Sequence, residues 1–433
     1  MTHYTLNRPE TPSLKGYLPQ IYRKWFFLRT QTHFNGKLVL QKPTEGPLGR
    51  TLSAPRPTAK PRRADHPEQR GSIMERRSFI TKSVKATGLG FSMTALSAAV
   101  AGTSPGSTII NASPARTPVK VAPRLSPGMN IGLIAPASNA FEDSDLYFAM
   151  DIVRSLGFRV TPAPNLFKRH GYLAGTDQER ASDLNLMFED PTIDAVFCAR
   201  GGYGASRILP LINYAAIAQS PKVLLGYSDI TALHLAINAA TGLITFHGPI
   251  ATQQFSDYTY ESFKRLLLDA ESKPVIAQPP TFQAQPGRAE RRNRLATLSP
   301  GKTQGRLIGG SLTLLTHLLG TPYAPDFTDA ILFLEDVNEA PYRIDRMLTA
   351  LWLAGVFEQI KGLAFGKFTK AETSGPSLSV GQVLRERTAN LDVPVVSGLM
   401  IGHIEDQATL PVGAMAELDA NTQTLRIIGS YLS

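Results

Sequence analysis

Short apolar runs alternate with segments of helical spacing from residue 128 onward, and this alternation constrains the fold more than any other feature of the chain. Buried strands are predicted at 130–136, 157–160, 195–199 and 222–225, and helices at 141–156, 177–188 and 232–240. Strands that alternate with helices in this way favour a parallel sheet covered on both faces. We therefore expect an α/β domain over 120–276.

The segment 277–305 interrupts the alternation. It contains Pro279-Pro280, a basic cluster at 288–294 and the sequence Ser299-Pro300-Gly301-Lys302. Such a composition predicts a linker or a long surface loop. A second domain is expected over 306–433, with helices at 311–319 and 342–353, strands at 330–334, 362–368 and 395–400, and a closing β-hairpin at 416–428.

The positive charge of the chain lies at its front. The formal net charge is +10, of which +9 falls on 1–73 and +3 on 74–101, leaving −2 for 102–433. A strongly basic chain often binds nucleic acid. Because the globular part is close to neutral, we expect no nucleic-acid partner.

Residues 74–101 have the pattern of a twin-arginine export signal. Arg76-Arg77 is followed by a weakly hydrophobic stretch and then by Ala99-Val100-Ala101, a small-residue cleavage site. We expect cleavage near Ala101 and a periplasmic protein, and a cytoplasmic one if the signal is not used. Translation is then expected to start at Met74, with 1–73 an over-extended or disordered addition. The apolar run is too short for a stable membrane anchor, so an integral membrane protein is not expected.

The single cysteine, Cys198, excludes an intramolecular disulfide. It lies in the apolar run 195–199, which favours a small core residue over a catalytic thiol. No second cysteine could complete a zinc site with it. We expect neither a metal nor a cofactor.

Three short segments supply the residue types of a serine hydrolase, each after an apolar run. They are Gly226-Tyr227-Ser228-Asp229, Leu334-Glu335-Asp336-Val337 and Gly402-His403. Ligand sites form at the carboxyl ends of strands in α/β proteins, and a serine at a strand-to-helix turn can act as a nucleophile. The pattern is also compatible with a helix N-cap made by Ser228 or Asp229.

The sequence pattern alone does not identify the acid and the base that would act with Ser228. Either Glu335 or Asp336 could orient an imidazole, and a carboxylate pair of the glycosidase kind is also conceivable. His247 and His403 both follow predicted strands, and the pattern alone does not choose between them.

The glycines of Arg200-Gly201-Gly202-Tyr203-Gly204 follow the strand at 195–199. Paired glycines let backbone amides approach a ligand closely, which favours an oxyanion or carboxylate site. A plain tight turn is the alternative. The pattern matches neither a phosphate-binding loop nor a dinucleotide-binding motif.

These motifs together resemble those of the LD-carboxypeptidases, the muramoyltetrapeptide carboxypeptidases of murein recycling, whose fold the microcin-C immunity peptidases share. Six segments occur in the order of that family: 200–204, 226–229, 247–249, 309–310, 334–337 and 402–403. The likeness covers roughly residues 128–430. The sequence departs from the family at Ser311, where an asparagine is frequent, and in its export signal.

The resemblance implies an N-terminal flavodoxin-like parallel-sheet domain and a smaller C-terminal mixed β/α domain, in a homodimer. It implies that Ser228 is the nucleophile, Glu335 the triad acid and His403 the base. The backbone amides of Gly202 and Asp229 match the oxyanion donors. Gly201 and Arg200 are the nearest candidates for holding the substrate carboxylate.

The function predicted in this way is a serine-type carboxypeptidase that cuts murein tetrapeptides between the L-configured diamino acid and the terminal D-Ala. A hydrolase of microcin-like peptidyl-nucleotides is the alternative within the hydrolases. A non-catalytic exported binding protein is the alternative outside them.

Overall fold

The computed structural model describes residues 117–433. The predicted extension at 1–73 and the predicted export signal at 74–101 lie outside these residues. Within the part that is described, no helix combines the length and the apolar character needed to cross a membrane.

A six-stranded sheet forms the N-terminal half, and its strand order is β12-β5-β4-β3-β1-β2. Five strands are parallel: β1 (Asn130–Ile134), β2 (Arg159–Pro162), β3 (Ala195–Cys198), β4 (Val223–Gly226) and β5 (Thr245–His247). The order 2-1-3-4-5 is that of flavodoxin-like folds. The predicted fold class is therefore confirmed.

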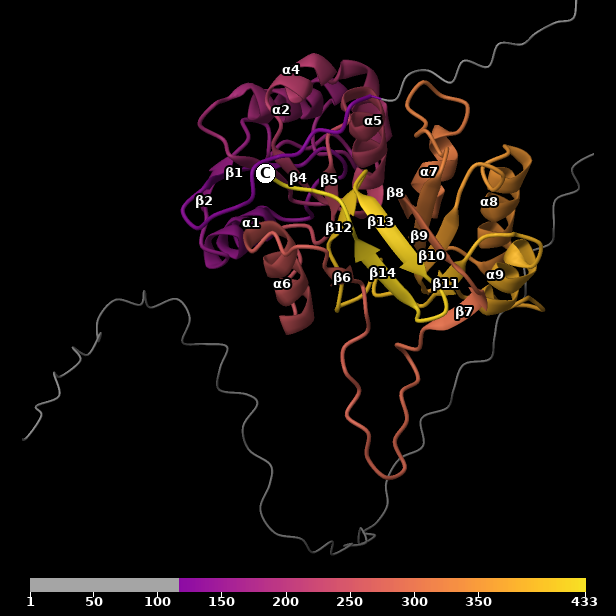
Figure 1. Ribbon diagram of the computed structural model, residues 1–433. Coiled ribbons are helices and arrows are strands. Elements are labelled where there is room, and N and C mark those ends of the chain that lie inside the picture. Colours follow the sequence, from indigo (N-terminus) through magenta and orange to yellow (C-terminus); the bar gives the residue numbers. More distant parts are fainter. Residues whose placement is uncertain (1–116) are drawn as a thin grey trace, which may run out of the picture. The chain divides into compact units, whose positions relative to one another are not determined.

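Helices cover both faces of this sheet, as the apolar character of its strands requires. Figure 1 shows α2, α4 and α5 on one side of the sheet and α1 and α6 on the other. The helical elements are α1 (Asp143–Ser155), α2 (Asp177–Glu189), α3 (Ala205–Ile208), η2 (Leu209–Leu211), α4 (Tyr214–Gln219), η3 (Ser228–Ile230), α5 (Thr231–Thr241), α6 (Asp257–Phe263) and the π-helical turn η4 (Lys264–Leu268).

An eight-stranded mixed sheet forms the C-terminal half, in the order β6-β14-β13-β8-β9-β10-β11-β7. Its strands are β6 (Val275–Ile276), β7 (Ala296–Ser299), β8 (Lys302–Ser311), β9 (Ala330–Val337), β10 (Gly362–Thr369), β11 (Val395–Ser397), β13 (Met415–Asp419) and β14 (Thr424–Ile427). Strands β8 to β11 run parallel, and α7 (Leu312–Leu318), α8 (Pro341–Leu353) and α9 (Val380–Thr388) connect them.

The two sheets share one continuous apolar core. The short strand β12 (Leu410–Val412) comes from the C-terminal half but pairs antiparallel with β5 at the edge of the first sheet. Pro411 is tolerated there because β12 is an edge strand. Because β12 pairs with β5, the loop that precedes β12 lies at the carboxyl end of β5.

The segment predicted as a linker, 277–305, contains regular structure at its far end. Strand β7 pairs with β11, and β8 begins at Lys302, before the predicted start of the second domain at 306. The part between β6 and β7 extends away from the sheets as a two-armed loop (Figure 1). The prolines and the basic cluster predicted a linker or a long surface loop here, but they did not predict the edge strand β7 that follows it.

Candidate active site

Ser228 lies at a sharp turn between β4 and α5. Its backbone has φ 66°, a left-handed conformation that costs a non-glycine residue roughly 1 kcal/mol. The N-cap positions beside it are Tyr227 and Ile230, and neither makes a side-chain capping bond. The N-cap interpretation of Ser228 and Asp229 is therefore excluded, and the serine hydroxyl is left for another partner.

That partner is His403, in the loop between β11 and β12. His403 Nε2 lies 2.9 Å from Ser228 Oγ, and its Nδ1 lies 2.8 Å from Glu335 Oε2. A side chain at Gly402 would place its Cβ 2.7 Å from the same Glu335 oxygen, and Gly402 has φ +117°. A glycine before the histidine is thus what lets this loop approach the acid so closely.

Glu335 is fully buried and lies inside β9, two residues before the strand ends. Its neighbour Asp336 points to the other face of the strand, as alternating side chains do. There Asp336 accepts hydrogen bonds from the amides of Thr313 and Val337, each at 2.8 Å. Burial raises the pKa of Asp336 to about 6, and the charge of Glu335 adds to the shift. Of the two carboxylates, only Glu335 faces the imidazole, so the structure shows no carboxylate pair shared in one site.

His247 does not reach the serine. Its ring is fully buried between Tyr227 and Phe333, with ring centroids 6.0 and 5.4 Å away. Burial, reinforced by the nearby histidines His234 and His403, holds its pKa well below the usual range. A histidine held neutral in the core, with no hydrogen bond to Ser228, cannot serve as its base. The choice that the sequence left open thus falls on His403.

The loop after β3 lies against the serine. A Cβ built on Gly201 would be 3.0 Å from the Cβ of Ser228, and Gly202 has φ +106°. Within the described residues, the amides of Gly202 and Asp229 donate no hydrogen bond to another part of the chain. They are therefore available to an oxyanion that forms on a carbonyl attacked by Ser228.

Buried charges hold that loop in place. The Asp229 carboxylate accepts a 2.7 Å hydrogen bond from the amide of Ala205, and burial raises its pKa to about 6. Arg180, also fully buried, donates to the carbonyl of Gly204 at 2.8 Å. The sequence predicted a role for the backbone amide of Asp229 but not for its side chain, and Arg180 lies in a segment that was predicted only as a helix.

Three other residues that the sequence analysis singled out, Arg200, Cys198 and Ser311, have different environments in the structure. Arg200 is exposed, and among residues 117–433 it makes no ion pair, so its guanidinium is free to meet a substrate anion. Cys198 is buried in β3, as predicted for a core residue, and burial raises the pKa of its thiol. Ser311 caps α7 by accepting from the amide of Leu314. Within the described residues, no group of three or more potential metal ligands is found.

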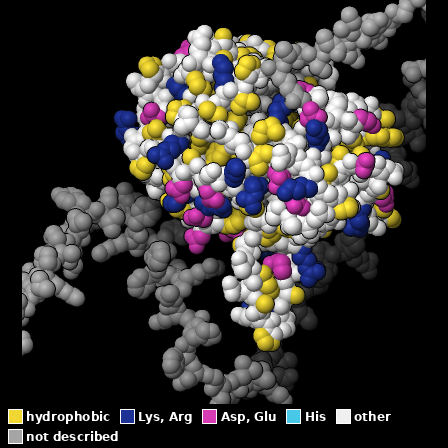
Figure 2. All heavy atoms as spheres, in the orientation of Figure 1, with side chains coloured by type: hydrophobic (Ala, Val, Ile, Leu, Met, Phe, Trp, Pro, Cys, Tyr) yellow, Lys and Arg dark blue, Asp and Glu magenta, His cyan; other side chains and the backbone are white. Residues whose placement is uncertain are grey.

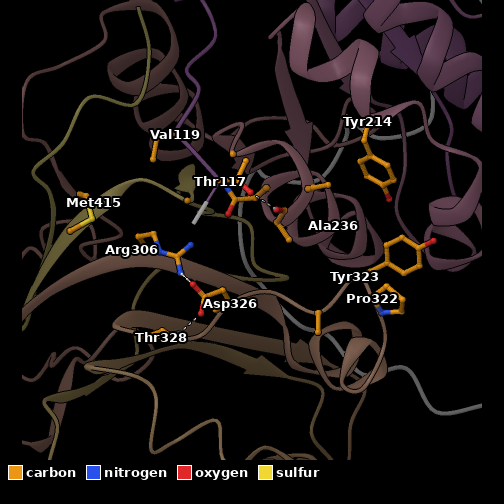
Figure 3. A pocket seen from close by; sticks show the side chains of 16 residues that line it. Thr117, Val119, Tyr214, Ala236, Arg306, Pro322, Tyr323, Asp326, Thr328 and Met415 are labelled. Atoms are coloured by element: carbon orange, nitrogen blue, oxygen red, sulfur yellow. Dashed lines mark hydrogen bonds and ion pairs between the residues drawn. The ribbon is translucent and has the colours of Figure 1, made fainter. Parts of the chain in front are cut away.

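A cavity of about 980 Å³ lies away from these residues, at the seam between α5 and the second sheet (Figure 3). Tyr214 and Tyr323 stack near one end of it, and Arg306 forms an ion pair with Asp326 at 2.7 Å. None of its lining residues belongs to the Ser228 site.

On the face shown in Figure 2, basic and acidic side chains are interspersed, as the near-neutral charge of the globular part leads one to expect.

A serine hydrogen-bonded to a histidine that is oriented by a buried carboxylate, beside two free amides, is the arrangement that serine hydrolases use. Comparison with known proteins gives the family. The description "LD-carboxypeptidase N-terminal domain" matches residues 131–248, and "LD-carboxypeptidase C-terminal domain" matches residues 304–418. The chain belongs to this family of S66 peptidases and is a carboxypeptidase of that kind.

Relatives carry two different names. A Bacillus subtilis protein named "Probable murein peptide carboxypeptidase" is 38% identical over 310 residues, which is 69% of this chain and 92% of that one. The microcin C7 self-immunity protein MccF of Escherichia coli is 30% identical over 329 residues, covering 71% and 96% of the two chains.

Solved structures agree with this placement. The muramoyltetrapeptide carboxypeptidase of Oxalobacter formigenes is 31% identical and has a TM-score of 0.60, covering 70% of this chain and all of that one. The apo structure of the MccF protein has a TM-score of 0.65 at 29% identity, covering 72% and 100%.

Proposed function

We propose that this protein is a serine-type LD-carboxypeptidase that releases the terminal D-Ala of murein tetrapeptides. The observation that carries the proposal is the His403 imidazole, which bridges Ser228 and Glu335 through contacts of 2.9 and 2.8 Å. The names of the 38% identical relative and of the Oxalobacter structure support the substrate class.

The proposed mechanism assigns each of these contacts a role. His403 Nε2 accepts the proton of the Ser228 hydroxyl, and the serine oxygen attacks the carbonyl of the diamino acid. Glu335 stabilises the imidazolium that forms, and the amides of Gly202 and Asp229 hold the oxyanion. His403 then protonates the leaving nitrogen of D-Ala, and water hydrolyses the acyl-enzyme by the reverse proton path.

The proposal predicts that only a free, D-configured C-terminal residue is removed. A carboxypeptidase must recognise the terminal carboxylate, which needs a cationic or N–H partner. We expect cleavage of L-Ala-γ-D-Glu-diamino acid-D-Ala and little cleavage when the last residue is L-Ala or its carboxylate is amidated. Mass spectrometry of the three digests measures this, and equal rates would instead indicate a general amidohydrolase.

Arg200 is the cation proposed to meet that carboxylate, together with the amides of Gly201 and Gly202. Arg200→Ala should raise KM for the tetrapeptide by about 10- to 100-fold, the loss of one charged hydrogen bond. Arg385, which is exposed on α9 and is not one of the predicted site residues, is the matched control. An unchanged KM in Arg200→Ala would move the carboxylate site elsewhere.

A second candidate, hydrolysis of a microcin-like peptidyl-nucleotide, is supported by the similarity to MccF. The higher identity to the murein-named relative favours the first candidate. Incubation of the purified protein with both substrates separates the two, and D-Ala release also separates both from a protein that only binds peptides.

We further propose that the protein is exported through the twin-arginine route and acts in the periplasm. Replacing Arg76 and Arg77 with lysine should retain the protein in the cytoplasm, because the paired arginines are what the export machinery reads. N-terminal sequencing of the native mature protein should begin near Gly102. A native protein that starts at Met1 in the soluble cytoplasmic fraction would contradict this. The homodimer implied by the family resemblance stays a prediction.

A further inference from the structure

From its N-cap onward, helix α6 carries a hydroxyl side chain at every third position. Ser256 is the N-cap, Thr259 lies in the first turn and Ser262 in the second. Residues three apart on a helix are neighbours on the same side of it. The three hydroxyls therefore form a row, and each of them makes a hydrogen bond with the loop 401–409, which carries His403.

Thr259 makes the central contact of this hydroxyl row. Its Oγ1 donates to the carbonyl of Glu405 at 2.9 Å and accepts from the amide of Gln407 at 2.9 Å. That amide also makes a turn contact of 3.1 Å with the Glu405 carbonyl. The hydroxyl thus bridges both ends of a tight turn, donating at one end and accepting at the other. Thr259 and Gln407 are fully buried, so water does not replace the bond between them.

The two ends of the hydroxyl row reinforce this contact. Ser256 Oγ donates to Asp406 Oδ1 at 2.7 Å, while it accepts the capping bond from the amide of Thr259. Ser262 Oγ accepts from the amide of Thr409 at 3.0 Å. The loop is therefore bonded to α6 along most of the length of this short helix.

Helix α6 is itself fixed to the core of the first sheet. Phe263, its last residue, is fully buried and makes edge-to-face contacts with Phe158 and Phe197, whose ring centroids are 6.5 and 6.1 Å away. Aromatic pairs of this geometry add to the stabilisation that burial provides. The loop, which belongs to the C-terminal half, thus has a well-packed base in the N-terminal half.

The same loop places the catalytic histidine. The amide of Ala408 donates to the carbonyl of Met400 at 2.9 Å, and His403 lies in the excursion between these two residues. On one side the imidazole contacts Glu335, and on the other side α6 holds the residues that closely follow His403. A misplacement of about 1 Å can lower the rate of an enzyme about a hundredfold. An anchor this close to the base therefore bears on catalysis.

We propose that Thr259 is a positioning residue for the reaction: through the hydroxyl row of α6 it holds the His403 loop where the imidazole meets Ser228. This inference rests on the proposed function, because it takes His403 as the base. It adds a requirement that the triad does not contain, namely that a helix of the N-terminal half hold a loop of the C-terminal half.

Thr259→Val tests the proposal, because valine retains the branched shape of the side chain and lacks only the hydroxyl. We expect kcat for D-Ala release to fall about 10- to 100-fold. KM should stay the same, since the fully buried Thr259 does not touch the peptide. Thr259→Ser, which keeps the hydroxyl, should restore the wild-type kcat. A loss of activity that comes from KM alone, or a Thr259→Ser protein as slow as Thr259→Val, would overturn the proposal.

Thr388→Val is the matched control. Thr388 is also a buried threonine on a helix, but its hydroxyl donates to the carbonyl of Leu384 in its own helix, α9. The control should lose stability without losing kcat. An equal fall of kcat in Thr388→Val and Thr259→Val would show a general effect of the substitution and would contradict the positioning role.

Asp406→Ala approaches the same contact from the loop side and leaves the cap of α6 in place. It removes one hydrogen bond to the hydroxyl row, so kcat should fall about 3- to 10-fold with KM unchanged. This variant decides the question if Thr259→Val does not fold. A wild-type kcat in Asp406→Ala would then count against the proposal.

Labelling by a fluorophosphonate separates the positioning role from the proposed substrate. In that reaction the Ser228 oxygen bonds to phosphorus as fluoride leaves, and His403 takes the hydroxyl proton, so no peptide is needed. We expect Thr259→Val to label about 10- to 100-fold more slowly than the wild type, and Thr259→Ser to label at the wild-type rate. If D-Ala is released but Thr259→Val labels and turns over normally, the positioning role is wrong and the proposed function stands. If labelling follows the hydroxyl but no D-Ala is released, the proposed substrate is wrong and the positioning role stands.

Discussion

Replacing Ser228 with alanine is expected to lower kcat for D-Ala release by about four to six orders of magnitude, because the members of a triad act as one unit. The hydroxyl makes its described contact with His403 and caps no helix, so the variant should fold normally. Ser144→Ala, an exposed serine at the start of α1, is the control and should retain wild-type turnover. A purified Ser228→Ala protein with near wild-type activity would remove the serine from the mechanism.

The strained backbone of Ser228 predicts that replacing this residue with glycine gains stability while activity is lost. Ser228 holds a left-handed conformation that only glycine adopts without strain. Ser228→Gly should therefore be as inactive as Ser228→Ala but more stable than it, by roughly 1 kcal/mol in the free energy of unfolding. Denaturant melts of the two variants measure the difference. Equal stabilities would mean that the turn stores no strain.

Glu335→Gln and Asp336→Asn are expected to have very different effects, although the two residues are adjacent. Glu335 orients His403, and a neutral amide there would favour the wrong imidazole tautomer, so kcat should fall by about 10⁴-fold. Asp336 faces Thr313 and Val337 instead, so Asp336→Asn should keep kcat within about tenfold of the wild type. Steady-state kinetics of both variants decide the assignment. A reversed result would make Asp336 the acid.

The pH dependence of stability gives a second readout on Asp336. Its pKa is raised from 3.8 to about 6 in the folded protein, so between these values the folded chain holds a proton that the unfolded chain has lost. Stability contributed by this group is therefore present at low pH and lost as the pH rises through about 6. Asp336→Asn cannot titrate, so its unfolding free energy should fall less between pH 4 and pH 7 than that of the wild type. Parallel denaturant melts test this.

The elements that depend on local patterning could be predicted from the sequence. The buried runs at β3, β4 and β9 and the helical spacing of α1 and α5 appear as expected, because each depends on residues a few positions apart. Short or irregular elements were missed, among them α6 and α9, since a turn or two of helix carries little periodic signal. Strand β12 was missed because it has only three residues, one of them a proline.

The selection between competing site residues could not be predicted from these patterns. Both faces of β9 are apolar and buried, so the sequence did not indicate whether Glu335 or Asp336 faces the serine. His247 and His403 both follow apolar runs, and only the burial of the first and the hydrogen bonds of the second distinguish them. The family resemblance named the same three residues, and the structure places His403 within hydrogen-bond distance of both Ser228 and Glu335.

The sequence by itself determined the fold class, the strand-end turns and the residue types available for chemistry, because local spacing encodes all three. Tertiary structure decided which of these residues meet. Ser228 and His403 are 175 positions apart and Glu335 and His403 are 68 apart. Their contacts exist because β12 pairs with β5 and draws the His403 loop over the first sheet, while β9 brings its buried carboxylate to the same place. Such long-range contacts depend on how two sheets pack, and no local pattern carries that information.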